Sequence, residues 1–283
     1  MNITKRQHYI PQFILKNFCE ENNKARYYNL EKNEVEMVDI REIFMEYFMY
    51  DDVINNESCP QKIENDLSKY ENEVSRLINK KLLQQDNIVL SKEEDDKLKL
   101  FFAIMAFRNF DAKEQFSNYS KKSAEIMKEF QSDLNFMDFW KRNLGYLVNC
   151  RSIKEVIDHE KIDKPVKIFM MRDTMNYTGI YFHIFEKRGE ENFVIGDCYP
   201  TVITGDNGVF IYSYIPLSSE RILLMITNEV AFINRDVLAF DLKEIKKPIT
   251  PYTIHVKKIY SDKVKMINET ITKNCKKGYI KCL

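Results

Sequence analysis

Three side chains far apart in the sequence have the chemistry of a catalytic site: His8, Arg108 and Asp197. A histidine can exchange a proton near neutral pH or ligate a metal ion, an arginine suits a phosphate group, and a carboxylate can hold a cation. We therefore interpret the three as candidate catalytic residues. Each also has a structural explanation. The histidine can anchor a loop, the arginine can satisfy carbonyl groups at a helix end, and the aspartate can bond the backbone of its own turn.

Two glutamates in a predicted helix form a candidate metal site. Glu64 and Glu71 are seven residues apart, so both project from nearly the same helix face, beside its apolar stripe. Together they can hold a divalent cation such as Mg²⁺ or Mn²⁺ at the edge of a cleft. The alternative is a solvated face on which both carboxylates pair with lysines.

The hydrophobic pattern predicts how these residues are positioned. It indicates a single α+β domain over residues 1–283, with helices and strands segregated along the chain. Residues 1–58 are expected to hold an N-terminal box and a hairpin. A helical layer over about 60–158 is expected to pack on a mainly antiparallel sheet over about 166–227, within a part (166–283) that ends in a C-terminal helix.

Local signals predict the individual elements. Ser91 and Glu94 form a capping box before an apolar helix that runs to about Arg108. Beyond Pro165 the hydrophobic period changes to two, which is typical of strands. The expected strands are 166–170, 179–185, 192–195, 208–212 and 221–226. The expected hairpin is 25–30 with 34–38, and further helices are expected at 112–132, within 136–158 and at 263–275.

Composition limits the classes of partner. Lys plus Arg and Asp plus Glu each number 43, so the formal net charge is zero and no global field directs the protein to nucleic acid or an anionic membrane. A local basic groove remains compatible with this balance. No apolar run approaches the roughly 18 residues of a transmembrane helix, and the N-terminus lacks the apolar core of a signal peptide. We expect a cytoplasmic protein without a membrane partner; the sequence does not set its oligomeric state.

The known sequence motifs of several enzyme classes are missing. The chain has no P-loop, no dinucleotide fingerprint and no His-Glu-x-x-His, so no nucleotide cofactor is expected. Its six cysteines include no Cys-x-x-Cys pair, so zinc-knuckle spacing is absent. His183 is expected on a partly exposed aromatic face of a strand. Asp173, Glu186 and Arg188 imitate a nuclease pattern only loosely, and we attribute that to chance.

Three segments together resemble one known family. They are His8–Phe18, with its His-Tyr-Ile-Pro box followed by Leu15 and Phe18; the Gly196–Pro200 turn with the later Tyr214–Ser218; and Lys265–Asn268 in the last predicted helix. This pattern resembles the bacterial domain-of-unknown-function family numbered 4238, over nearly the whole chain. The turn departs from the family pattern, because Ile195-Gly196 stands where Thr-Ser is expected and Cys198-Tyr199 adds a residue before the proline. The resemblance implies no activity.

Two hypotheses for the function follow. The first is a metal-dependent hydrolase, a nuclease-like effector on a phosphate-containing substrate, because a motif with His, Asp and Arg favours a site over a scaffold. The alternative is a non-enzymatic interaction protein, such as a regulator or a phage-related inhibitor, whose many aromatic side chains would anchor an interface with a protein or nucleic acid. Both suit phage defence or counter-defence. In either case we expect the N-terminal box to be packed inward, with His8 pointing toward the turn at Asp197.

Overall fold

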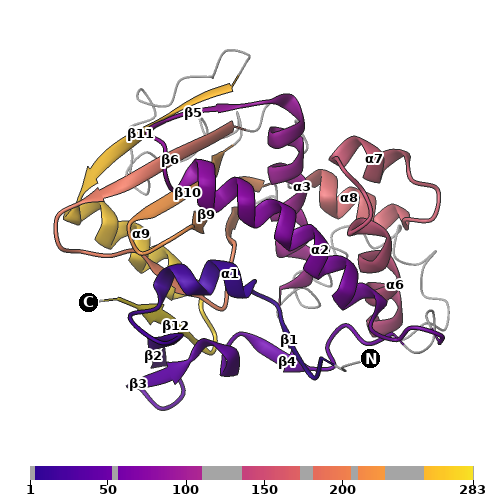
Figure 1. Cartoon of the computed structure of the whole chain (residues 1–283), viewed down its shortest axis with the longest axis horizontal. Coiled ribbons are helices and arrows are strands. Elements are labelled where there is room, and N and C mark those ends of the chain that lie inside the picture. The colour runs from indigo at the N-terminus through magenta and orange to yellow at the C-terminus, as the bar shows by residue number, and fades with distance from the viewer. Residues whose placement is uncertain are drawn as a thin grey trace.

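Helices and strands occupy different parts of the molecule, which confirms the predicted α+β fold (Figure 1). The computed structural model describes residues 4–52, 57–109, 136–172, 181–204, 210–226 and 252–282. The helices are α1 (Gln12–Leu15), α2 (Lys62–Leu77), α3 (Lys92–Arg108), α6 (Phe136–Leu147), α7 (Ile153–Asp158), α8 (Lys164–Arg172) and α9 (Ser261–Asn274), with the short turns η1 (Lys16–Phe18), η2 (Ile40–Glu42) and η3 (Ile78–Leu82). Among the described residues, no helix is long and apolar enough to cross a membrane.

The described strands form three sheets. They are β1 (Arg6–His8), β2 (Lys24–Asn29), β3 (Glu34–Asp39), β4 (Met45–Tyr47), β5 (Asn87–Leu90), β6 (Tyr181–Arg188), β7 (Val194–Gly196), β8 (Thr201–Thr204), β9 (Phe210–Pro216), β10 (Arg221–Ile226), β11 (Tyr252–Tyr260) and β12 (Gly278–Lys281). The largest sheet has the order β5-β11-β6-β10-β9-β8, and only its β6–β11 pair is parallel. The sheet is therefore mainly antiparallel, as predicted.

The N-terminal hairpin joins a second sheet. Strands β2 and β3 form the predicted hairpin, and β2 pairs with β12 near the C-terminus, giving the order β3-β2-β12-β7. The strand expected at 192–195 is β7 of this sheet, so it does not belong to the larger one. The second sheet thus brings the first and last parts of the chain together (Figure 1).

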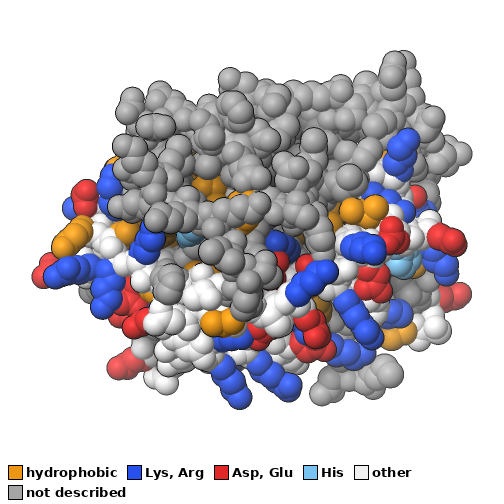
Figure 2. Space-filling view, turned by 90° about the horizontal axis from the view of Figure 1, so that it is seen from above, with side chains coloured by type: hydrophobic (Ala, Val, Ile, Leu, Met, Phe, Trp, Pro, Cys, Tyr) orange, Lys and Arg blue, Asp and Glu red, His pale blue; other side chains and the backbone are white. Residues whose placement is uncertain are grey.

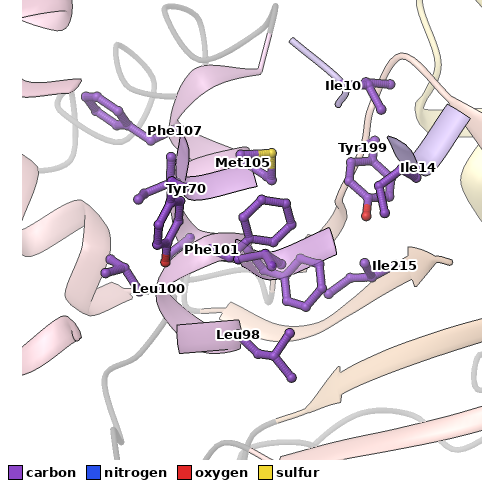
Figure 3. Packing of buried hydrophobic residues seen from close by; sticks show 14 of the residues in the cluster. Ile10, Ile14, Tyr70, Leu98, Leu100, Phe101, Met105, Phe107, Tyr199 and Ile215 are labelled. Carbon is purple, nitrogen blue, oxygen red and sulfur yellow. The ribbon is translucent and has the colours of Figure 1, made fainter. Parts of the chain in front are cut away.

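Side chains cover both faces of the large sheet. Phe182 and Ile184 of β6 join the main core, which they share with α2 and α3. Tyr181 and Phe185, on the opposite face, pack in a second cluster with Val264, Ile267 and Ile271 of α9. The face expected to be partly exposed is therefore covered by the C-terminal helix. Helix α3 lies in the main core, and Ile10, Ile14 and Tyr199 gather on one side of it (Figure 3).

One predicted strand is wrong. Residues 166–170 belong to α8, which begins at Lys164. Val166, Phe169 and Met170 are all fully buried, and their spacing of three and four is that of a helix face. Short apolar runs fit both periods, and here the helical one prevails.

The capping box of Ser91 and Glu94 is present at α3, whereas the helix expected at 112–132 lies outside the described residues.

The N-terminal box is packed inward, as expected. Strand β1 pairs with β4, and Tyr9, Ile10, Leu15 and Phe18 are buried in the main core. Burial of such side chains contributes about 1.5–3 kcal/mol each relative to exposure. The box is therefore a structural component of the core.

Gly278 should not tolerate a side chain. A Cβ atom there would overlap the carbonyl oxygen of Tyr28 and the ring of Tyr27 on the paired strand β2. We expect Gly278→Ala to lower the free energy of unfolding by about 2 kcal/mol, because a backbone atom cannot move aside without distorting the sheet. Urea denaturation measures this effect.

Gly145 supplies the matched control. It lies within α6, and a Cβ there would be 3.5 Å from the side chain of Ile63, an ordinary contact. Gly145→Ala should therefore be neutral or stabilise the protein by up to about 1 kcal/mol through helix propensity. Equal losses in the two variants would contradict the role given to Gly278.

Candidate functional site

Arg108, at the end of α3, is the buried centre of the candidate site. Its guanidinium donates hydrogen bonds to the carbonyl oxygens of His8 (2.9 Å) and Tyr9 (3.1 Å) and to the carboxylate of Glu71 (2.6 Å). Its Cζ atom also lies 5.7 Å from the centre of the Tyr50 ring. Arg108 is only 1% exposed. It therefore joins the N-terminal box to α2 and α3, and its charge is directed into the protein.

The ring of His8 is held on both sides. Its Nε2 lies 3.2 Å from the carbonyl oxygen of Ile40, and its Nδ1 lies 3.3 Å from the side-chain nitrogen of Gln12. A ring protonated on Nε2 satisfies both contacts while remaining neutral. Burial lowers the pKa of His8 to about 4, which keeps the ring neutral at pH 7. These contacts favour a role for His8 in anchoring a loop over a catalytic role.

Asp197 belongs to a different cluster. It follows β7, is 2% exposed, and its carboxylate accepts the backbone N–H of Lys276 at 3.0 Å and that of Lys277, both between α9 and β12. Burial raises the pKa of Asp197, and these backbone hydrogen bonds oppose the rise. In the described part of the chain, no hydrogen bond or ion pair joins its carboxylate to His8 or Arg108. The three predicted catalytic side chains are thus divided between two clusters.

Tyr9 and Asn109 each interact with a residue of the Asp197 turn. Burial and then the negative charge of Asp197 raise the pKa of Tyr9, so the charge of Asp197 acts on this residue of the box. The side chain of Asn109 donates to the carbonyl oxygen of Tyr199 at 3.1 Å, which attaches the end of α3 to the same turn. Two residues therefore link the Arg108 cluster to the turn without placing Asp197 in it.

Glu64 is a half-buried carboxyl whose pKa is strongly raised. It lies in the first turn of α2 and is half-buried, and its carboxyl forms no hydrogen bond or ion pair with any described residue. Burial raises the pKa of Glu64 to about 7; the charge of Arg108 opposes the rise, and those of Glu71 and Asp51 add to it. A carboxyl with a pKa near 7 can both take up and release a proton at neutral pH. Such groups are concentrated at functional sites.

Glu64 and Glu71 differ in their partners. Glu71 is 20% exposed and paired with Arg108, so it is fixed in position. The use of the two carboxylates together as metal ligands stays a prediction. Among the described residues, the group whose ligand atoms lie within 4.8 Å of one another is Asp197 with Cys198 and Cys275. The two cysteines are far apart in the sequence, so their spacing gave no signal of this cluster.

Sequence reasoning also missed the surroundings of Arg108. Tyr50 is fully buried, its hydroxyl donates to the carbonyl oxygen of His8 at 3.2 Å, and its backbone N–H donates to Gln7 at 2.5 Å. It lies in a segment without hydrophobic periodicity. The one available signal was composition, because the segment around Tyr50 is rich in aromatic residues.

The residues of the nuclease-like pattern and His183 complete the set of candidates from the sequence. Glu186 pairs with the buried Arg221, and Arg188 stacks on Tyr260. Asp173, the third member of the nuclease-like pattern, lies outside the described residues. Burial, followed by the charge of Lys257, lowers the pKa of His183 to about 4, so this ring is neutral at pH 7.

The fold and the site define an α+β protein in which a buried arginine joins an N-terminal His-Tyr-Ile-Pro box to an acidic helix face. The chain belongs to the family described as protein of unknown function (DUF4238), whose model matches residues 6–280. The box, the Arg108 cluster and the Asp197 turn all lie within that range. No curated protein and no solved structure matches the chain.

Proposed function

We propose that the protein is a nuclease-like hydrolase of phosphate-containing substrates in which Glu64 transfers the proton. The observation that supports this most directly is a half-buried carboxyl with a pKa of about 7 beside a buried arginine. In its ionised form Glu64 would accept a proton from an attacking water molecule, and in its protonated form it would donate one to a leaving oxygen. Arg108 acts as a positioning residue, because its hydrogen bonds hold Glu71 and the box.

A divalent cation such as Mg²⁺ or Mn²⁺ is the second part of this proposal. Glu64 and Glu71 on one face of α2 would supply carboxylate oxygens, which suit these cations, and the cation would stabilise charge on a phosphate. With the cation bound, Glu64 would stay ionised, so it would then accept the proton of the attacking water and not donate one. Basic and acidic side chains are interspersed on the described part of the face in Figure 2. A polyanionic substrate would therefore be recognised by a local site and not by a long-range field. The proposal places the protein in the cytoplasm, as an effector in phage defence or counter-defence.

A substrate panel tests the hydrolase proposal. Purified full-length protein is incubated with RNA, single-stranded DNA, double-stranded DNA and a chromogenic phosphodiester at pH 6–9, with EDTA, Mg²⁺ or Mn²⁺. We expect hydrolysis that Glu64→Gln reduces about 100-fold, because the amide cannot exchange the proton. Glu73→Gln is the matched control, since Glu73 lies on the same helix, is 58% exposed and pairs with Lys97. Intact substrates under all of these conditions, or equal rates for Glu64→Gln and wild type, would contradict the proposal.

An interaction function is the second candidate. Strand β3 ends the second sheet, and its side chains Val35 and Met37 are 62% and 52% exposed. Tyr47 and Phe48, at and after β4, are also exposed, at 59% and 43%. Exposed apolar side chains on an edge strand suit a protein partner. Co-purification of one defined partner, lost in the double variant Val35→Glu and Met37→Glu, would support this candidate; no change in that partner's binding would count against it.

A further inference from the structure

The fold brings two cysteines into contact from distant parts of the sequence. Cys198 lies in the turn after β7, and Cys275 follows the last residue of α9. Their sulfur atoms are 3.6 Å apart, and both side chains are half-buried. Both thiols also reach the carbonyl oxygen of Ile271, at 3.4 and 3.3 Å. The two sulfurs and this oxygen therefore form a compact triangle at the C-terminal end of α9.

Asp197 adds a carboxylate to this triangle. Its ligand oxygen and the two sulfurs all lie within 4.8 Å of one another. The backbone N–H groups of Lys276 and Lys277 hydrogen-bond this carboxylate and fix its orientation. Outer hydrogen bonds of this kind are typical of carboxylates that ligate metal ions.

We propose that Asp197, Cys198 and Cys275 bind a thiophilic divalent cation. The chemistry of these ligands favours Zn²⁺. Zinc takes four ligands in a tetrahedron with Zn–S distances of about 2.3 Å, which places two sulfur ligands ~3.8 Å apart. The observed 3.6 Å is close to that separation. A sulfur and an oxygen ligand of such a tetrahedron lie ~3.6 Å apart, and the Ile271 carbonyl oxygen, 3.4 and 3.3 Å from the sulfurs, is close enough to fill the fourth position.

The backbone at Gly196 makes room for the cluster. A Cβ atom at this position would overlap the sulfur of Cys275. A glycine is therefore needed for this sulfur to approach Cys198 and Asp197. The space that the site requires is thus provided by the chain itself, independently of the three ligand side chains.

The chemistry of the ligands indicates the kind of cation and its role. Two thiolates favour zinc over magnesium or manganese, which prefer oxygen. On binding, each thiol releases its proton to solvent, and the cation replaces the contacts that the S–H groups made. Four protein ligands leave no open position, so the bound ion is structural. It would connect the turn after β7 to the connection between α9 and β12. This site is separate from Glu64 and Glu71 and goes beyond the proposed function.

Cobalt provides the test, because Co²⁺ in a thiolate site absorbs visibly. The full-length protein is stripped with a chelator under reducing conditions and titrated first with Co²⁺ and then with Zn²⁺. We expect one equivalent of Co²⁺, a thiolate-to-cobalt charge-transfer band, the visible bands of tetrahedral cobalt, and their loss when Zn²⁺ is added. The readout is binding, so it is unaffected if no hydrolase activity exists.

Serine variants assign the ligands. Cys275→Ser should weaken Co²⁺ binding at least ~10-fold and remove most of the charge-transfer absorption, since losing a ligand costs at least as much as losing its outer partner. Cys282→Ser is the matched control, because Cys282 is also half-buried and donates to a carbonyl oxygen, that of Phe18, at 3.2 Å. Wild-type protein without the band, or an unchanged band in Cys275→Ser, overturns the proposal. The wild-type titration decides even if the variant fails to fold.

Discussion

Replacing Arg108 with methionine should lower the free energy of unfolding by about 3–5 kcal/mol. Methionine fills a similar volume but provides no hydrogen-bond donor. The carboxylate of Glu71 would lose its ion pair, and the carbonyl oxygens of His8 and Tyr9 would lose their donors. Water could not replace these donors easily, because Arg108 is only 1% exposed. Each unsatisfied buried group costs about 1–3 kcal/mol, so the loss is a large share of the stability of a typical protein.

Urea denaturation of three variants separates the parts of this effect. Arg76→Met removes an exposed arginine of α2 and should change the free energy of unfolding by less than about 0.5 kcal/mol. In Glu71→Gln the amide oxygen still accepts from Arg108, but the buried guanidinium loses its counter-ion, so this variant should also lower the free energy of unfolding. The double variant Arg108→Met with Glu71→Gln should recover part of the loss, because no unpaired charge remains. A loss under 1 kcal/mol for Arg108→Met would contradict the role of Arg108 in joining the N-terminal box to α2 and α3.

Local sequence patterns predicted the elements whose side chains have only one good periodicity. The capping box at Ser91 and the apolar run behind it define α3, and the turn between two alternating segments defines the β2–β3 hairpin. The strand predicted for residues 166–170 was wrong because five residues fit the periods of both a strand and a helix. Val166 and Phe169 are buried on one side, as on a helix face. The pairing of β2 with β12 joins opposite ends of the chain, so no local pattern contains it.

The candidate site was predictable to a similar extent. Helical spacing placed Glu64 and Glu71 on one face of α2, and the apolar helix before Arg108 predicted that this arginine ends it. The partners of Arg108 are backbone carbonyls of the box, which carry no residue signature. The contact between Cys198 and Cys275 depends on how α9 packs beside β7, which the sequence spacing does not contain. Residue types therefore indicated the chemistry, and tertiary packing decided which groups meet.

Glu64→Gln should stabilise the protein at alkaline pH and leave its stability unchanged at acidic pH. The folded state raises the pKa of Glu64 from 4.5 to about 7, so it binds this proton more tightly than the unfolded state does. Well below pH 4.5 the carboxyl is neutral in both states, and the wild type carries no penalty. As the pH rises through 7, the wild type becomes less stable than Glu64→Gln, because its folded state must keep an ionised carboxylate half-buried. Allowing for partial exposure to solvent, the penalty is about 2 kcal/mol at pH 8.

Urea denaturation at pH 4.5, 6 and 8 checks this sign. The advantage of Glu64→Gln over wild type should be below about 0.5 kcal/mol at pH 4.5 and reach about 2 kcal/mol at pH 8. Glu73→Gln should show the opposite direction, because the hydrogen bond and charge of Lys97 lower the pKa of Glu73. A difference that does not change with pH would show that the raised pKa is absent. A Glu64→Gln variant that is more stable and also inactive would mean that the chain tolerates this carboxyl at a cost in stability because the chemistry requires it.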